Sequence, residues 1–157
     1  MIVDIIPYNT KHKDAFKHLN IEWLETYFYV EPYDLEVLSK PETYIINKGG
    51  YIFFAQHNDE IVGTVALMPT QINSVLELTK MAVSPEARGL GIGQKLIEHC
   101  IAFAKAENLS KLILYSNTIL ENAIHIYKKW GFIEIPVEEN ASYERANIKM
   151  EKIINHK

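Results

Sequence analysis

Apolar side chains in the first third of the chain recur with two different periods, which predict one strand and two helices. Residues 2–7 (IVDIIP) are a short apolar run typical of a strand. Pro32 and Pro41 bound a short helix from Tyr33 to Leu38, since proline opens helices and restricts the residue before it. A longer helix is expected after Thr10, the predicted N-cap, and its apolar stripe comprises Phe16, Leu19, Trp23, Leu24, Tyr27 and Phe28.

Three strand-like segments follow in quick succession. Tyr51–His57 and Glu60–Met68 are separated by a polar Asn-Asp turn, which predicts a hairpin. Val75–Val83 comes next, after a second turn. Because the connections are short, we expect these strands to be antiparallel neighbours.

The pattern then alternates between helix and strand. An apolar face predicts a helix at about residues 91–107, followed by a strand at Lys111–Ser116 and a second helix at about residues 119–130. Gly131 occupies the position where a helix end favours left-handed geometry. Two final strands are predicted, Phe132–Val137 and Tyr143–Ile153.

The predicted order is β-α-α-β-β-β-α-β-α-β-β, which indicates an α/β (or α+β) fold. A strand–helix–strand unit in the middle requires a right-handed parallel crossover inside an otherwise antiparallel sheet. We therefore expect a mixed, mostly antiparallel sheet of about seven strands flanked by helices. Neither a repeat nor a linker divides the sequence, so residues 1–157 are interpreted as a single domain.

Composition excludes several classes of function. The net charge is -4 and no basic stretch is present, so we expect no nucleic-acid partner. Cys100 is the single cysteine, and no Cys/His cluster has zinc spacing, so neither a disulfide nor a metal is expected. Without a signal-peptide pattern or a long apolar run, the expectation is a cytoplasmic protein with no membrane partner.

The strongest local signal is a glycine-rich loop, Arg88-Gly89-Leu90-Gly91-Ile92-Gly93, between a predicted strand and a predicted helix. Exposed backbone N–H groups at such a helix start form an anion site suited to a pyrophosphate. The dinucleotide fingerprint fails because its last glycine is replaced by Gln94, and the P-loop motif is absent. A glycine-rich turn with no ligand is the alternative that this loop alone leaves open.

Two separated motifs resemble those of the GNAT superfamily of N-acetyltransferases. Arg88-x-x-Gly91-x-Gly93 matches its Q/R-x-x-G-x-G/A motif, which binds the pyrophosphate of coenzyme A. The segment from Ala123 through Tyr127 to Gly131-Phe132 is similar to its A-x-x-x-Y-x-x-x-G-F element. The predicted element order also matches that of the superfamily across nearly all of residues 2–154.

The resemblance implies acetyl-CoA as co-substrate and specifies its binding residues. Backbone groups of Met81, Ala82 and Val83 are expected to pair with the pantetheine arm. Many members of the superfamily carry a pantetheine-contacting asparagine where this chain has Leu120. Asn117 is a candidate replacement, although an Asn in Ser-Asn-Thr also suits a turn. The loop expected to enclose the pyrophosphate comprises Arg88, Gly89, Leu90, Gly91, Ile92, Gly93 and Gln94.

Two residues are candidates for catalysis. Tyr127 occupies the tyrosine position of the superfamily element and is expected to protonate the leaving thiolate, although its place on an apolar stripe also suits packing. Glu77 lies four residues before Met81, the spacing at which several members carry a general base. Period-2 alternation places Glu77, Thr79 and Met81 on one face if no bulge intervenes. A solvent-facing glutamate is the alternative interpretation.

The implied function is transfer of an acetyl group from acetyl-CoA to a primary amine by direct attack in a ternary complex. A small molecule, an amino acid or a peptide N-terminus would serve as acceptor. Glu31 and Asp34 favour a cationic acceptor, whereas Arg145 on the last strand favours a carboxylate-bearing one, so the acceptor stays open. Homodimers are frequent in the superfamily. The alternative function is a non-catalytic sensor that binds acetyl-CoA.

Overall fold

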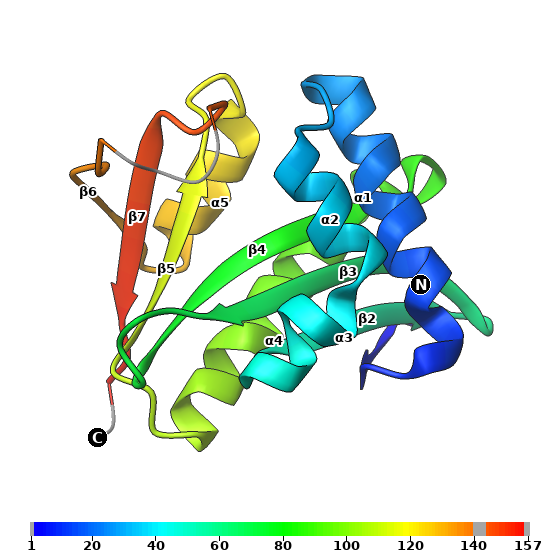
Figure 1. Ribbon diagram of the computed structural model, residues 1–157, viewed down its shortest axis with the longest axis horizontal. Helices are drawn as coiled ribbons and strands as arrows, with labels where there is room; N and C mark the ends of the chain where they lie inside the picture. The colour runs from blue at the N-terminus through cyan, green and yellow to red at the C-terminus, as the bar shows by residue number, and fades with distance from the viewer. Residues whose placement is uncertain (1, 140–143, 156–157) are drawn as a thin grey trace.

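The computed structural model describes residues 2–139 and 144–155, which form one seven-stranded sheet with helices on both faces (Figure 1). The strands lie in the order β1-β2-β3-β4-β5-β7-β6. Their bounds are β1 Asp4–Pro7, β2 Tyr51–His57, β3 Glu60–Pro69, β4 Val75–Val83, β5 Lys111–Ser116, β6 Ile133–Ile135 and β7 Ile148–Ile153.

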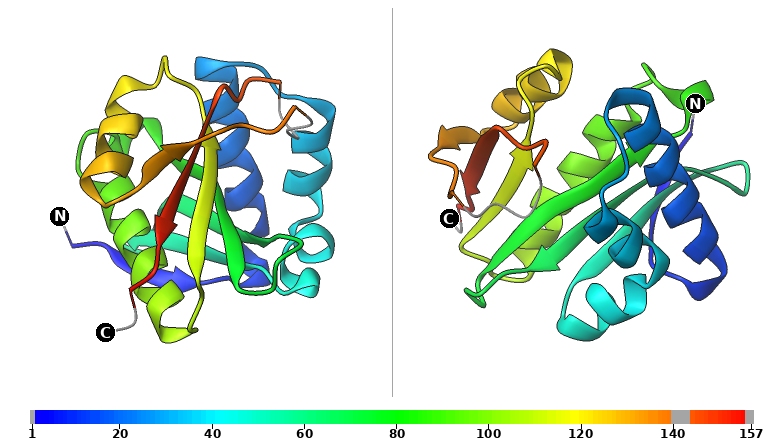
Figure 2. Two further views of the ribbon diagram at one scale, coloured as in Figure 1. Left: turned by 90° about the vertical axis from the view of Figure 1, so that its left-hand side faces the viewer. Right: turned by 45° about the horizontal axis from the view of Figure 1, so that its top comes forward.

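The pairing confirms the predicted mixed sheet. β1 to β4 are successive antiparallel neighbours, and β7 is antiparallel to both of its neighbours, β5 and β6. β4 and β5 are parallel, because the helix between them returns the chain to the same end of the sheet. This pairing covers Val75–Glu77 against Lys111–Ile113, and beyond it the two strands diverge (Figures 1 and 2).

Helices cover the sheet on two sides, as Figure 2 shows. The N-terminal helices α1 (Lys13–Tyr27), α2 (Pro32–Ser39) and α3 (Pro41–Tyr44) pack on one face. α4 (Ile92–Ala106) and α5 (Glu121–Lys129) lie on the other. Alternation along β2 supplies a core on each face: Phe54 joins Phe16 and Leu38 on the side of α1 and α2, and Phe53 joins Leu96 on the side of α4.

Several predicted element ends are wrong. Asn9, rather than Thr10, accepts a hydrogen bond at the start of the first helical segment, a 3-10 turn over Thr10–His12 that precedes α1. The short helix α3 was not predicted. β6 ends at Ile135 and β7 begins at Ile148, so both final strands are shorter than predicted. Tyr143, the predicted start of the last strand, lies outside the described residues.

The chain reverses at Gly131 as the sequence predicts. Gly131 adopts a left-handed φ of 94° after α5, and Phe132 then donates a backbone hydrogen bond to Tyr127. Phe132 packs edge-on against the Tyr127 ring, with ring centroids 5.9 Å apart. The turn therefore holds Tyr127 against the core where β4 and β5 diverge.

Candidate active site

A bulge in β4 is the first feature that positions the site. Between Thr79 and Ala82, β4 has one residue more than the facing stretch of β3, and Lys80 there adopts a left-handed φ of 56°. Met81 consequently packs on the same core as Leu78. The predicted common face of Glu77, Thr79 and Met81 is therefore wrong, because the bulge reverses the alternation.

The glycine loop is open where a ligand would approach. Gly89 and Gly91 adopt left-handed φ angles of 82° and 81°, and a Cβ placed at either, or at Gly93, would meet no atom within 4 Å. Gly91 precedes the first residue of α4, so the free N–H groups of that helix start border the loop. These features fit an anion, and the glycines leave its path to the backbone clear.

Arg88 is held by contacts within the protein. Its guanidinium forms an ion pair with Glu22 of α1 and lies over the Tyr27 ring, 5.5 Å from the centroid. Its Nε donates a hydrogen bond to the Val83 carbonyl at 3.1 Å. Tyr27 is 43% exposed and so is not the core residue that the helical stripe predicts. Arg88 thus connects the loop to α1 and to the end of β4.

A groove of about 780 Å³ extends from the glycine loop to α5. Met81, Ala82 and Val83 form one side, and residues of α5 form the other. Leu90 is 53% exposed and is not among the lining residues. The predicted loop residues that do line the groove are Arg88, Gly89, Gly91, Ile92, Gly93 and Gln94.

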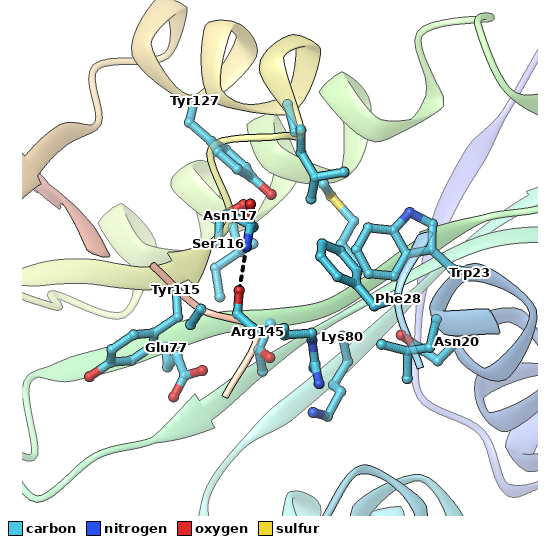
Figure 3. A pocket seen from close by; sticks show the side chains of 17 residues that line it. Asn20, Trp23, Phe28, Glu77, Lys80, Tyr115, Ser116, Asn117, Tyr127 and Arg145 are labelled. Carbon is cyan, nitrogen blue, oxygen red and sulfur yellow. Dashed lines mark hydrogen bonds between the residues drawn. The ribbon is translucent and has the colours of Figure 1, made fainter. Parts of the chain in front are cut away.

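A second cavity, of about 150 Å³, adjoins this groove (Figure 3). Glu77 and Tyr115 lie on one side of it, and the rings of Trp23 and Phe28 lie on the opposite side (Figure 3). Five residues line both the cavity and the groove, so the two spaces meet there: Trp23, Met81, Leu120, Ala123 and Tyr127. We name the larger space the cofactor groove and the smaller one the acceptor pocket, after the two substrates that the sequence leads us to expect.

Tyr127 lies at the junction of the two spaces. Its side chain points toward the acceptor pocket (Figure 3), and the residue is 8% exposed. Burial raises the pKa of Tyr127 from 10.0 to about 12, so the hydroxyl keeps its proton at neutral pH. A protonated hydroxyl at this place can donate a hydrogen bond to a group that spans the junction.

Glu77 lines the opposite part of the acceptor pocket. It is half-buried, and burial raises the pKa of its carboxyl, against the opposing effect of Lys80 and Lys149. A carboxyl with a raised pKa binds a proton more readily near neutral pH than an exposed glutamate does. The solvent-facing alternative therefore does not describe its environment.

Four charged side chains form a buried cluster behind the acceptor pocket. Arg145 donates to both Asp34 oxygens, at 2.8 and 3.0 Å, and to Glu31 at 2.6 Å. Lys80 Nζ lies 3.3 Å from Asp34 Oδ1. Burial alone would raise the pKa of Asp34, but Arg145 and Lys80 outweigh it, and the pKa lies below the ordinary 3.8. Glu31 and Asp34 therefore bind Arg145. The sequence interprets these residues as separate signals for a cationic and an anionic acceptor, whereas in the structure they neutralise one another.

This cluster connects segments far apart in the sequence. Arg145 precedes β7 in a turn, not on the last strand as predicted, and Glu31 and Asp34 belong to the start of α2. The Glu144 backbone N–H also donates to Glu31, at 3.2 Å. Sequence separations above 100 residues leave no local signal for these contacts. The turn that contains Arg145 is thus fixed against the start of α2.

Asn117 lines the acceptor pocket, but its amide also makes local contacts. Nδ2 donates to the Arg145 carbonyl at 2.6 Å, and Oδ1 accepts from the Ile119 backbone at 3.0 Å. The second bond is an Asx turn, the turn-forming role that the sequence offers as the alternative. Leu120, which replaces the usual asparagine of the superfamily, lines both the pocket and the groove.

Other candidates contribute nothing to the site. Cys100 is fully buried, and burial raises the pKa of its thiol far above the usual range. Within residues 2–139 and 144–155, no group of three or more His, Cys, Asp or Glu side chains is placed to hold a metal ion. Over the same residues, every helix is too short or too polar to cross a membrane.

Sequence reasoning found the glycine loop and Tyr127, but missed part of the acceptor pocket. Lys80, Asn20 and Phe28 line it without having been assigned to a site. Trp23 was interpreted as core, yet it is half-buried and faces both spaces. Asn20 could have been recognised, because it is a polar residue between Phe16 and Leu24 on the apolar stripe of α1. In the structure it is 3% exposed.

Comparison with known proteins identifies the family. The sequence pattern of the acetyltransferase (GNAT) family matches residues 15–132. A probable N-acetyltransferase 14 of Xenopus tropicalis is 35% identical over 74 residues, which are 47% of this chain and 36% of that protein. The chain thus matches little more than a third of that relative's length.

Solved structures match almost the whole chain. A GNAT-family acetyltransferase of Staphylococcus aureus Mu50 superimposes with a TM-score of 0.86 and 25% identity, over 98% of this chain and 100% of that one. A PaiA N-acetyltransferase of Thermoplasma acidophilum, solved with coenzyme A, gives 0.78 and 20% identity, over 98% and 99%. With the glycine loop, the diverging strands and the family match over residues 15–132, this chain belongs to the acetyltransferase (GNAT) family.

Proposed function

We propose that the protein is an acetyl-CoA-dependent N-acetyltransferase that acts on a primary amine by direct attack in a ternary complex. The observation that carries the proposal is the junction of the cofactor groove and the acceptor pocket at Met81 and Tyr127. Two substrates that enter these spaces from different sides can meet there without a covalent enzyme intermediate. The family match and the coenzyme A in the Thermoplasma relative support this choice of co-substrate.

The residues present fit acetyl-CoA. The helix start after Gly91 and the open glycines suit the pyrophosphate, and Arg88, which pairs with Glu22, lines the groove beside them. The β4 edge at Met81–Val83 lines the groove and faces away from β3, where a pantetheine arm would pair like an added strand. When bound, acetyl-CoA supplies a thioester carbonyl as the electrophile.

The reaction forms one bond and breaks one. The amine nitrogen attacks the carbonyl carbon, a C–N bond forms, and the C–S bond breaks to leave a thiolate, while the nitrogen loses a further proton to solvent as it becomes an amide. An alkyl ammonium has a pKa of about 10.4, so a proton must first leave the nitrogen near neutral pH. We assign that proton to Glu77, directly or through water, since burial raises the pKa of its carboxyl. Backbone N–H groups of β4 beyond the bulge stabilise the oxyanion.

Tyr127 acts on the leaving sulfur. A thiol has a pKa of about 8.5, whereas that of Tyr127 is about 12. Complete proton transfer from the tyrosine to the thiolate is therefore uphill, by roughly 5 kcal/mol. We assign to Tyr127 a hydrogen bond that stabilises the thiolate as the C–S bond breaks, with solvent supplying the proton afterwards.

Ligand-dependent thermal unfolding tests the co-substrate. Acetyl-CoA at about one hundred times its dissociation constant adds about 2.7 kcal/mol to the folded state, which raises the midpoint by about 5–10 °C for a chain of this size. NADH and ATP, which also carry phosphates, are the controls. An equal shift with ATP, or none with acetyl-CoA, would exclude the assignment. Binding without acetylation of any amine would favour the sensor function.

A further inference from the structure

The charges around the acceptor pocket nearly cancel. Glu31, Asp34 and Glu77 carry three negative charges, and Lys80 and Arg145 carry two positive ones. Lys149 and Glu138, which also act on Glu77, form an ion pair with each other. One negative charge is left, which one ammonium group would balance. A second charge on the acceptor, of either sign, would enter a partly buried space without a counter-charge.

Arg145 is already bound and is poorly placed to receive a substrate carboxylate. Its guanidinium contacts Asp34 through two bonds and Glu31 through a third, and its side chain is 15% exposed. Arginine favours such planar two-point contacts, and breaking them would remove the arginine from Glu31 and one of the two cations that pair with Asp34. Arg145 therefore neutralises Glu31 and Asp34, so that their charges are not available to an acceptor in the pocket.

The wall opposite Glu77 is mostly apolar. The Trp23 and Phe28 rings lie there, 5.8 Å apart between centroids, beside the polar Asn20 (Figure 3). Leu24 also lines the pocket. Such a wall binds a hydrocarbon or an aromatic group, and it offers a second ammonium no carboxylate, only cation–π contacts and the neutral amide of Asn20. The acceptor body is thus recognised by apolar contact and its nitrogen by charge.

We propose that Arg145 determines acceptor specificity by neutralising Glu31 and Asp34, so that the pocket selects an apolar amine with a single charge and rejects diamines and amino acids. This inference rests on the proposed N-acetyltransferase function and names its substrate class. Arg145 is a specificity-determining residue here, not a catalytic one, since its bonds are to the protein.

Three acceptors of one length test the inference with the wild-type protein: hexylamine, 1,6-diaminohexane and 6-aminohexanoate. They differ only in the distal group, which is neutral, cationic or anionic. Mass spectrometry of the acetylated product gives kcat/KM for each. We expect hexylamine to exceed both others by at least about tenfold, because an uncompensated charge in a desolvated site lowers affinity strongly. Equal rates, or a faster diamine or amino acid, would overturn the inference.

Charge variants then change the preference in opposite directions. Arg145→Met uncovers Glu31 and Asp34, and should raise the ratio for 1,6-diaminohexane over hexylamine by about tenfold or more. Glu31→Gln removes one negative charge and should raise the ratio of kcat/KM for 6-aminohexanoate over that for hexylamine. Arg145→Lys keeps the charge and is the matched control, with its preference close to that of the wild type. Unchanged ratios in folded Arg145→Met would contradict the role of Arg145.

The two proposals fail in different ways. If acetyl-CoA does not raise the unfolding midpoint, the proposed N-acetyltransferase function is itself contradicted. A retained shift with no turnover of hexylamine overturns the acceptor class alone. Should Arg145→Met not fold, as circular dichroism would reveal, the wild-type ranking of the three acceptors still decides the substrate class, and Glu31→Gln decides whether this cluster sets it.

Discussion

Lys80 and Asp34 form a buried ion pair between β4 and α2, with Nζ and Oδ1 3.3 Å apart and side chains 3% and 0% exposed. Lys80 stands in the left-handed region, with φ at 56°, which is unfavourable for a residue with a Cβ. Loss of this contact would remove one of the two cations that pair with the buried Asp34 carboxylate. The pair therefore stabilises the bulge that directs Met81 into the cofactor groove.

Asp34→Asn should destabilise the protein by about 3–5 kcal/mol, because Lys80 would lose this carboxylate at a buried site and Arg145 would lose one of the two carboxylates that it binds. Glu36→Gln on the same helix is the matched control. Glu36 pairs with Lys40 at an exposed site, with side chains 53% and 59% exposed. That pair should contribute less than about 1 kcal/mol. Urea unfolding measures both, and equal losses would show that the buried cluster is not stabilising.

Gly93→Glu should weaken acetyl-CoA binding by about a hundredfold or more, because its carboxylate would enter the anion site. Gly93 is preferable to Gly91, since a side chain at Gly91 would also strain a φ of 81°. Lys95→Gln changes the net charge by the same amount on the exposed side of α4. It should alter binding less than about fivefold. Isothermal titration calorimetry measures both affinities. Similar affinities for the two variants would contradict the proposal that the glycine loop binds the pyrophosphate.

Tyr127→Phe should lower kcat by about 10–100-fold, the effect of losing one hydrogen bond to a charged sulfur. The KM for acetyl-CoA should change little, because the phenyl ring keeps its packing against Phe132. Tyr8→Phe is a control, as its hydroxyl bonds to Glu42 away from both spaces. An unaltered kcat in Tyr127→Phe would show that Tyr127 contributes to packing and not to catalysis.

Glu77→Gln should remove the acidic limb of the pH profile of kcat/KM. In the wild type, activity should fall as the pH decreases through the pKa of Glu77, because only the carboxylate accepts a proton. That limb should lie above the ordinary value of 4.5, since burial raises the pKa. The basic limb, which reports other groups, should persist. An identical profile in the variant would assign proton removal to water instead.

Most of the sheet could be predicted from the sequence, because its elements depend on local patterns. Glycine and the surrounding helical pattern predicted the left-handed turn at Gly131, and alternation predicted the bounds of β2, β4 and β5. The bulge at Lys80 could not be predicted in this way. Lysine has no preference for a positive φ, so the sequence gives no sign that the two-residue alternation changes there.

The acceptor pocket was less predictable because it depends on distant contacts. Arg145 and the acids of α2 were each recognised as charged, and were interpreted as rival signals for different acceptors. Their direct pairing, at a sequence separation of 111 between Asp34 and Arg145, reverses that interpretation. Only the folded chain brings these residues to one side of the pocket.

The divergence of β4 and β5 divides the sheet into two units, which we expect to differ in stability. Parallel pairing joins the units over Val75–Glu77 and Lys111–Ile113, and β5, β7 and β6 beyond it form a small three-stranded unit. Regions with fewer shared hydrogen bonds open locally at lower free energy. We expect backbone amides of β5–β7 to exchange with deuterium faster than those of β2–β4. A ligand that fills the groove between the units would slow this exchange, and so couple their opening into one cooperative event.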